Sequence, residues 1–327
     1  MNRFFLVVFG GSAVVAASLL VSYGAGMAWT AISPRLGSIK LPVLGAMADA
    51  VMPKPTDGTS INGLTRKVTW SASQEEDLID AAVMSLPASD DGKITAASYL
   101  VKDLSQLGTV SGSTLSRDPD RVMPIASITK LVTAAVAKQL IPVDDKVSIT
   151  AAITATYGNT AGFRGGESFR AGDLLYPLLM VSSNDAAEAL AQHYGRSKFI
   201  AAMNGFVQSI GAYRTYFADP SGLSPDNVST ADDIALIIEW LRQNDPDIIS
   251  ITQLKSKTMR DHTWTNPTHF LSWSNYAGGK NGYTPEADRT GVSLFTLGRS
   301  KDMYAVVVLG SESRDTDEIK LLRKVAY

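Results

Sequence analysis

The order of hydrophobic and polar residues divides the folded part of this chain into strands, then helices, then strands again. Two short runs on either side of Gly108 are rich in β-forming residues and predict a hairpin. Beyond them, hydrophobic residues recur every three or four positions, which predicts helices. The expected helices cover residues 127–140, 171–195, 197–211 and 230–244, and a last one covers 316–327. The expected later strands cover residues 278–284, 290–298 and 303–310.

This order predicts an α+β fold. Strands from both ends of the folded part are expected to join in one antiparallel sheet, with helices on its faces and a helical subdomain inserted between the strand groups. We expect the folded domain to cover residues 67–327 and to begin with a helix near residues 75–86. A linker with prolines, glycines and no sustained period is expected at residues 35–66.

A hydrophobic segment is expected at residues 1–34, because no charged residue occurs between Arg3 and Arg35. A cleaved signal peptide has an apolar region of about 7–15 residues, whereas a membrane-spanning helix needs about 20. The length favours an uncleaved membrane anchor. Cleavage near residues 26–28 is the alternative, and a buried core helix is a second one. Either an anchored or a secreted protein would work outside the cytoplasm.

Composition narrows the function classes. The chain has 327 residues, 45% of them hydrophobic, which is enough for a sizeable core. Its net charge of −2 gives no reason to expect a nucleic-acid partner. The absence of cysteine excludes thiol catalysis, disulfides and thiolate metal sites.

The stretch PIASITKLVTA at residues 124–134 carries Ser127 and Lys130 three positions apart. Such residues lie on one face of a helix, about one turn apart. Burial or a nearby cation can lower the pKa of a lysine until it activates a serine nucleophile. The helix N-terminus also offers N–H groups to a developing oxyanion. The alternative is an amphipathic helix with two polar side chains on its rim.

Two further polar clusters follow along the chain. Ser182, Ser183 and Asn184 close an apolar run, and alone they also fit a helix break in which polar side chains bind free backbone groups. Lys280, Asn281 and Gly282 follow two glycines. Alone they also fit a β-turn, because Asn-Gly is a favoured hairpin dipeptide.

Taken in order, Ser-x-x-Lys, Ser-x-Asn and Lys-x-Gly resemble the active-site triplet of penicillin-binding proteins and serine β-lactamases. The flanking segments resemble those of low-molecular-mass D-alanyl-D-alanine carboxypeptidases, from about residue 66 to the C-terminus. The segments that carry the resemblance are PIASITKLVTA, GESFRAGDLLYPLLMVSSNDAAEALA, DPSGLSPDNVSTADDIA and GGKNGYTPEA. The resemblance implies a β-lactamase/transpeptidase-like fold. It also implies a serine peptidase that removes the terminal D-alanine of peptidoglycan stem peptides.

The resemblance also implies roles for individual residues. Ser127 would be the acylated nucleophile, Lys130 would take its proton, and Ser182 would relay a proton to the leaving nitrogen. The backbone N–H groups of Ser127 and Tyr283 would form the oxyanion hole. The residues implied to bind substrate are Asn184, which would also hold Lys130, and Lys280, Asn281, Gly282, Tyr283 and Arg314.

The triplet departs from the family pattern at two positions. Ser183 replaces a usual glycine, and Asn281 stands where a threonine or serine hydroxyl normally binds the substrate carboxylate. We expect Asn281 to weaken the activity while acylation by β-lactams is retained.

Several activities remain open at this stage. An endopeptidase on D-alanyl cross-links uses the same triplet, and Asn281 also suits a catalytically impaired wall-binding homologue. A class A β-lactamase is disfavoured, because no Glu-x-x-Leu-Asn element occurs between Asn184 and Lys280. No cofactor or metal is expected, since the spacing of His193, His262 and His269 does not suggest a ligand cluster.

Overall fold

The computed structural model describes residues 92–105, 115–297 and 302–325, together with Val8–Phe9 and Ser12–Ala13. The chain divides into two compact units, Met1–Leu86 and Pro87–Tyr327. In the first unit, β1 (Val8–Phe9) and β2 (Ser12–Ala13) pair antiparallel. The rest of the predicted hydrophobic segment, the linker and the first predicted helix lie outside the described residues. Among the helices of the described part, none combines the length and apolar character needed to cross a bilayer.

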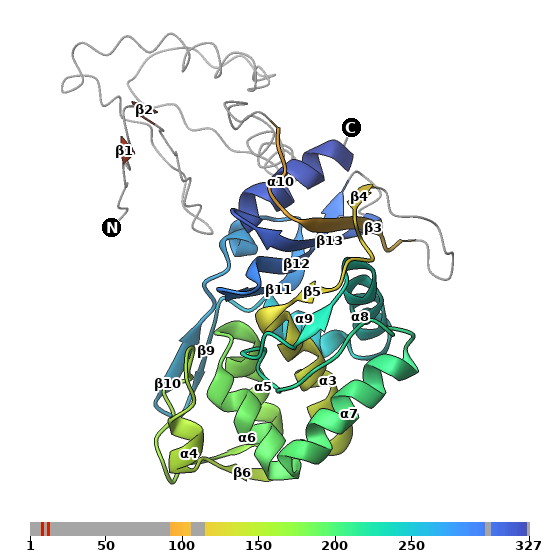
Figure 1. Cartoon of the computed structure of the whole chain (residues 1–327). Helices are drawn as coiled ribbons and strands as arrows, with labels where there is room; N and C mark the ends of the chain where they lie inside the picture. Colours follow the sequence, from red (N-terminus) through yellow and green to blue (C-terminus); the bar gives the residue numbers. More distant parts are fainter. Residues whose placement is uncertain (1–7, 10–11, 14–91, 106–114, 298–301, 326–327) are drawn as a thin grey trace, which may run out of the picture. The chain divides into compact units, whose positions relative to one another are not determined.

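A five-stranded antiparallel sheet with the order β11-β12-β13-β3-β4 lies between α10 (Arg314–Val325) and the helical part of the second unit (Figure 1). β3 (Ser98–Asp103) and β4 (Leu115–Arg117) are the predicted first hairpin. The later strands are β11 (Tyr276–Thr284), β12 (Asp288–Leu297) and β13 (Asp302–Ser311). Because β13 pairs with β3, the two strand groups join in one sheet, and the predicted α+β fold is confirmed.

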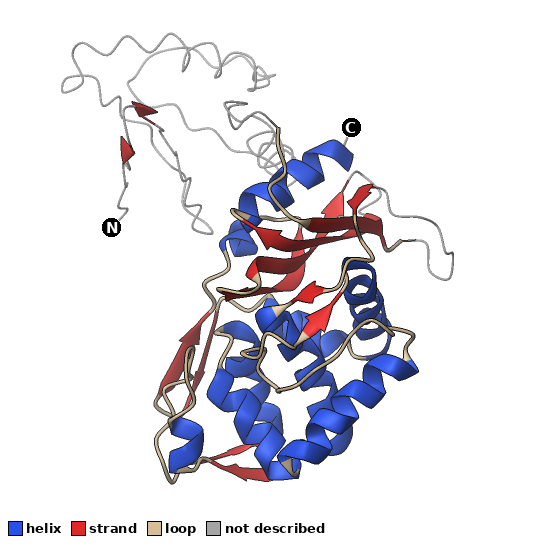
Figure 2. Ribbon diagram, in the orientation of Figure 1, coloured by secondary structure: helices blue, strands red, loops and turns tan. Residues whose placement is uncertain are grey.

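The two faces of this sheet bury alternate residues of each strand. On β13, Val306 and Val308 pack with Leu321 of α10, which covers one face. Val307 and Leu309 belong instead to the larger core on the opposite face. There α8 (Ala231–Asn244) packs against β3 and β13. Helices therefore cover both faces, as Figure 2 shows.

The inserted subdomain is mostly helical and lies between β4 and β11 in the sequence. Its core helix is α3 (Thr129–Leu140), which follows the short 3-10 helix η1 (Ala126–Ile128) and is buried from Thr129 to Ala137. Besides α8, the other helices in this stretch of the chain are α4 (Ala151–Thr154), α5 (Ala171–Met180), α6 (Asn184–Tyr194), α7 (Arg196–Ser209), α9 (Pro246–Thr252) and the 3-10 helix η2 (His269–Ser272). Short antiparallel pairs join β5 (Met123–Pro124) to β8 (Val228–Ser229), β6 (Lys146–Ser148) to β7 (Ser168–Arg170), and β9 (Ser256–Met259) to β10 (His262–Thr265).

The predicted helical stretch at residues 171–195 is two helices rather than one. α5 ends at Met180, and Ser182 adopts a left-handed backbone with φ of 59°. Ser183 then caps α6, because its side chain accepts a hydrogen bond from the Ala186 N–H. The polar cluster therefore breaks the helix and leaves Ser182 on the connection between the two halves.

The β-turn alternative for residues 280–282 is wrong. Lys280, Asn281 and Gly282 lie inside β11 and pair with Val292, Gly291 and Thr290 of β12. The hairpin closes further on, after the Thr284–Asp288 pair. The Asn-Gly dipeptide does not turn here because the neighbouring strand continues alongside it.

Candidate active site

The Ser-x-x-Lys pair is formed as its spacing predicts. Lys130 Nζ lies 2.8 Å from Ser127 Oγ, because η1 and the first turn of α3 place the two side chains on one face. Lys130 Nζ also donates a hydrogen bond to the Ser221 carbonyl at 2.5 Å. The lysine is fully buried. Its amine is therefore held in one position beside the serine hydroxyl.

The surroundings of Lys130 favour its neutral form. Burial lowers the pKa of the ammonium well below its usual 10.5, and the positive charge of Lys280 lowers this pKa further. The carboxylates of Asp219 and Asp185 act in the opposite direction but do not reverse the shift. A neutral amine beside a hydroxyl is the arrangement that a general base requires.

A segment to which we assigned no individual role from the sequence, residues 219–222, supports this pair. Gly222 packs so closely on the Ala126 carbonyl that a Cβ at this position would lie 2.0 Å from that oxygen. Ala126 itself is left-handed, with φ of 45°, directly before Ser127. Asp219 holds the segment by accepting hydrogen bonds from the Ser221 and Gly222 N–H groups. The DPSG stretch is part of the resemblance to the family, but by itself it carries no recognisable chemistry that predicts this contact.

The second cluster places one free hydroxyl in the cleft. Ser182 Oγ is buried and has no hydrogen-bond partner among the described residues. Together with the left-handed backbone of Ser182, this is a strained and unsatisfied position of the kind found at functional sites. The Asn184 amide instead donates to the Tyr157 carbonyl at 2.8 Å. The contact of Asn184 with Lys130 that the resemblance implies remains a prediction.

The third cluster packs directly on the first. β11 is an edge strand of the sheet, and a Cβ added to Gly282 would lie 2.8 Å from the Ser127 nitrogen. This close approach brings the edge of β11 beside the Ser127 N–H. Burial lowers the pKa of Lys280 to about 7, and the charge of Arg314 contributes to the shift. The Lys280 ammonium donates to the Asn281 carbonyl at 2.8 Å.

One cavity connects the three clusters. It has a volume of about 550 Å³, and its lining includes Ser127, Ser182 and Lys280. The predicted substrate-binding residues Asn281, Gly282, Tyr283 and Arg314 also line it. Lys130, which is buried behind Ser127, and Asn184 are the two predicted site residues that are not part of this lining. Arg289, which we did not select from the sequence, belongs to it as well.

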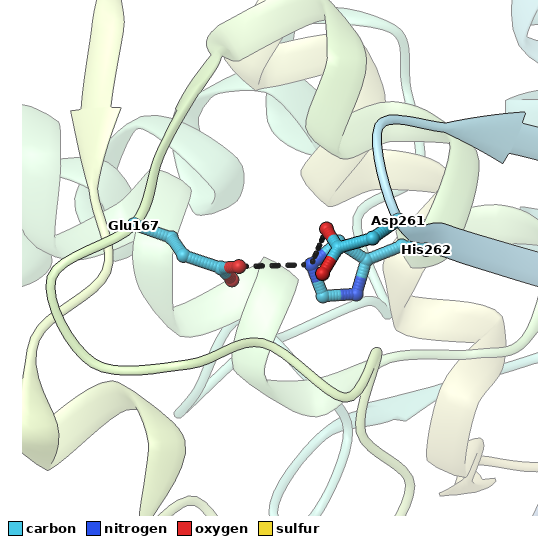
Figure 3. Close-up of side chains that lie close together, drawn as sticks. All are labelled: Glu167, Asp261 and His262. Carbon is cyan, nitrogen blue, oxygen red and sulfur yellow. Dashed lines mark hydrogen bonds and ion pairs between the residues drawn. The ribbon is translucent and has the colours of Figure 1, made fainter.

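The three histidines lie in different places. His269 lines the cavity, and His193 lies 3.5 Å from Asp145. Figure 3 shows His262 with the carboxylates of Glu167 and Asp261 directed at one imidazole nitrogen, at 3.1 and 3.6 Å.

The donor types of Glu167, Asp261 and His262 would suit a divalent metal ion. However, the Arg164 guanidinium already pairs with Asp261 and lies 3.7 Å from Glu167. We therefore interpret this group as an ion-pair network that ties the β9–β10 hairpin to the loop before β7.

Known structures share this fold. The structure of D-alanyl-D-alanine carboxypeptidase from Mycobacterium tuberculosis H37Rv aligns with a TM-score of 0.64 and 28% identity, over 73% of this chain and 94% of that one. The fold and the three clusters together define the penicillin-binding class of serine DD-peptidases, with a transpeptidase-like fold. Residues 84–313 match the D-alanyl-D-alanine carboxypeptidase family. The chain belongs to this family.

Relatives within the family carry two different activity names. A D-alanyl-D-alanine endopeptidase of Pseudomonas aeruginosa is 35% identical over 222 residues, which are 64% of this chain and 71% of that protein. A D-alanyl-D-alanine endopeptidase of Escherichia coli K12 is 35% identical over 187 residues, which are 56% of this chain. This chain covers 58% of the length of the E. coli protein.

Proposed function

We propose that the chain is a serine DD-carboxypeptidase that removes the terminal D-alanine from peptidoglycan stem peptides. The observation that carries this proposal is the 2.8 Å contact between Ser127 Oγ and the buried Lys130 amine. Since burial disfavours the charged form of Lys130, the amine is available to accept the serine proton as Oγ attacks the D-alanyl carbonyl.

The remaining steps are assigned to the residues that the family resemblance implies. The tetrahedral oxyanion would be bound by the N–H groups of Ser127 and Tyr283, in keeping with the close approach of β11 to Ser127. As the C–N bond breaks, Ser182 passes its proton to the D-alanine nitrogen and is reprotonated with the proton that Lys130 took, so that an acyl-enzyme and a neutral Lys130 remain. Water then attacks the ester and gives a proton to Lys130. Lys130 returns this proton to Ser127 Oγ as the ester C–O bond breaks and the shortened peptide is released.

Substrate binding is assigned to the other cavity residues. Lys280 and Arg314 supply positive charge for the terminal carboxylate, and Asn281 replaces the usual hydroxyl with an amide donor. Asn184 is assigned to the substrate backbone. A β-lactam presents a strained amide to the same serine and would act as a covalent inhibitor.

An endopeptidase that cleaves D-alanyl cross-links is the second candidate. It uses the same acyl-enzyme chemistry on a larger leaving group. It is supported by the endopeptidase names of the relatives from P. aeruginosa and E. coli, each 35% identical to this chain. A catalytically impaired wall-binding homologue has Asn281 as its support.

Peptidoglycan as substrate would place the domain outside the cytoplasm. Residues 1–34 remain our predicted membrane anchor or signal, and residues 35–66 the predicted linker to the domain at 67–327. Fractionation of the expressed chain with N-terminal sequencing tests this. Membrane-bound, unprocessed protein is expected, and a soluble processed form would contradict the anchor.

Intact-mass measurement after incubation with a penicillin tests the proposed chemistry. The protein is expected to gain the mass of one penicillin, and Ser127→Ala is expected to gain none. Release of D-alanine from a synthetic pentapeptide then reports hydrolysis. Equal labelling of the two proteins would show that Ser127 is not the nucleophile.

A further inference from the structure

The β11–β12 hairpin carries one cavity-lining side chain, Arg289, that has no role in the proposed function. Asn281 pairs with Gly291, and Tyr283 pairs with Arg289. Direct partners in an antiparallel pair share a face of the sheet, as do residues two apart on one strand. Asn281, Tyr283 and Arg289 therefore lie on one face, and Lys280 and Gly282 face the other side.

Arg314 joins this face through the space that Gly291 leaves. A Cβ added to Gly291 would lie 2.4 Å from Arg314 Cδ and 2.8 Å from Glu318 Oε1. The aliphatic part of Arg314 therefore lies over the backbone of β12. Arg289 lies two residues before Gly291 on β12. Both Arg289 and Arg314 line the cavity that contains Ser127.

The two arginines differ in how their charge is balanced. Arg314 Nε donates to Asp315 at 2.8 Å. Arg289 lies over the Tyr283 ring at 5.6 Å from its centroid and donates to the Glu312 carbonyl at 3.1 Å. Within the described part of the chain, these contacts bring no carboxylate to Arg289. Its guanidinium is positioned by an aromatic ring and is available for an anion from outside.

The spacing indicates what that anion belongs to. Arg289 is two residues from Gly291, over which Arg314 lies, and positions two apart on a strand are separated by roughly 6.5–7 Å along the backbone. A ligand whose first carboxylate is bound at Arg314 therefore needs a second anionic group, further along the sheet edge, to reach Arg289. A single leaving D-alanine has one carboxylate and ends there. A leaving group that continues into a second acidic peptide arm reaches both sites.

We propose that Arg289 is a specificity-determining residue that binds a second carboxylate, on a leaving group larger than D-alanine. The cleft would then prefer cross-linked stem peptides to free stem ends. This inference rests on the proposed serine DD-peptidase activity. Of the two candidate functions, it favours the endopeptidase that cleaves D-alanyl cross-links. The cavity of about 550 Å³ is in the usual range for ligands much larger than one amino acid.

The test compares two substrates with the same full-length protein. One is a peptide dimer joined by a D-alanyl cross-link, with a free carboxylate on its acceptor arm, and the other is the uncross-linked pentapeptide. Arg289→Gln is expected to lower kcat/KM for the dimer on the order of 10- to 150-fold, the range for one hydrogen bond to a charged group. Most of the loss should be in KM. Arg289→Lys should recover part of it.

The pentapeptide and penicillin labelling serve as internal controls. Arg289→Gln should leave both within about twofold of wild type, because the substitution is outside the reacting groups. Arg121→Gln, at an exposed arginine outside the cavity lining, should change neither substrate. For the wild type, amidation of the acceptor-arm carboxylate of the dimer should lower kcat/KM by the same factor as Arg289→Gln does. For Arg289→Gln, the same amidation should not lower kcat/KM any further.

The outcomes separate this inference from the proposed function. Equal effects of Arg289→Gln on dimer and pentapeptide, or no effect on either, would overturn the second carboxylate site while acylation persists. Failure of the wild type to react with penicillin and with both substrates would overturn the peptidase activity and the site together.

Discussion

The two walls of the cleft are built differently. On the helical wall, Lys130 is completely buried and contacts both Ser127 and the Ser221 carbonyl. On the sheet wall, β11 is an edge strand, and Tyr283 is 61% exposed. The proposed nucleophile and base thus lie on the buried helical wall, whereas most of the proposed substrate-binding residues lie on the sheet wall. Of the two departures from the family pattern, Asn281 lies on the sheet wall, and Ser183 is the buried cap of α6 on the helical wall.

Removing the base on the helical wall should have the largest effect. Lys130→Met keeps most of the side-chain volume but cannot accept the Ser127 proton. The rate of acylation by penicillin should fall on the order of 10²–10⁴-fold, the usual contribution of a general base. Stopped-flow labelling measures this rate. Lys138→Met, on the same helix but paired with Asp245, is the matched control and should acylate normally.

A substitution at Gly282 that pushes β11 away from Ser127 should have the next largest effect on the rate of acylation. Gly282→Ala would place a Cβ 2.8 Å from the Ser127 nitrogen and 2.7 Å from Thr290 Oγ1. If the oxyanion site is displaced, acylation should slow on the order of 10²–10³-fold. Overpacking should also lower the free energy of unfolding by about 1–3 kcal/mol. Gly165→Ala, where a Cβ would meet nothing within 4 Å, is the control. Unchanged acylation in Gly282→Ala would contradict the assigned oxyanion hole.

Replacing the Asn281 side chain on the sheet wall should have a smaller effect, and this effect should be an increase in the rate of D-alanine release. Asn281→Thr restores the hydroxyl that normally binds the substrate carboxylate. A hydrogen bond to a charged group contributes about 1.5–3 kcal/mol, so D-alanine release should rise on the order of 10- to 150-fold. Penicillin acylation and D-alanine release are measured side by side. If neither form releases D-alanine, the wall-binding interpretation gains support.

The smallest expected effect is on the pH dependence of stability, through the buried Glu318 of α10, which packs against β12. Burial raises the pKa of the Glu318 carboxyl to about 8, and the Arg314 charge only partly opposes this. Between the usual value of 4.5 and about 8, the folded protein holds a proton that the unfolded chain releases. Stability should therefore fall as pH rises through this interval.

Glu318→Gln should remove this pH dependence and keep an acceptor for the Ser293 hydroxyl, which donates at 2.8 Å. The slope of the unfolding free energy should become flatter by up to about 1.4 kcal/mol per pH unit. Urea unfolding at pH 5 and pH 8 measures the difference. Glu312→Gln, an exposed position on the connection before α10, is the control. Parallel slopes for the wild type and Glu318→Gln would show that Glu318 is not a protonated buried acid.

The hydrophobic pattern determined most of the fold, because helix and strand periods are local properties of a sequence. The helices at α3, α7, α8 and α10 and the strands of the central sheet lie within a few residues of their predicted ranges. The break at Ser182 was only an alternative, since a left-handed residue between two good helical runs has no distinct periodicity. The β-turn that the Asn-Gly dipeptide alone would favour does not form, because these residues pair with β12 in the strand predicted at residues 278–284.

The residue types and their order in the sequence identified the family, because acyl transfer needs a nucleophile, a base and a positive charge in every member. Only the tertiary structure decided which other groups meet them. The contact of Gly222 with Ala126 joins positions almost a hundred residues apart, by sequence number, and leaves no local signal. Arg289 enters the cavity because strand register places it beside Tyr283 and the space above Gly291. The register of two paired strands depends on contacts between distant parts of the chain. Local sequence patterns therefore do not predict which residues of β11 and β12 lie opposite each other.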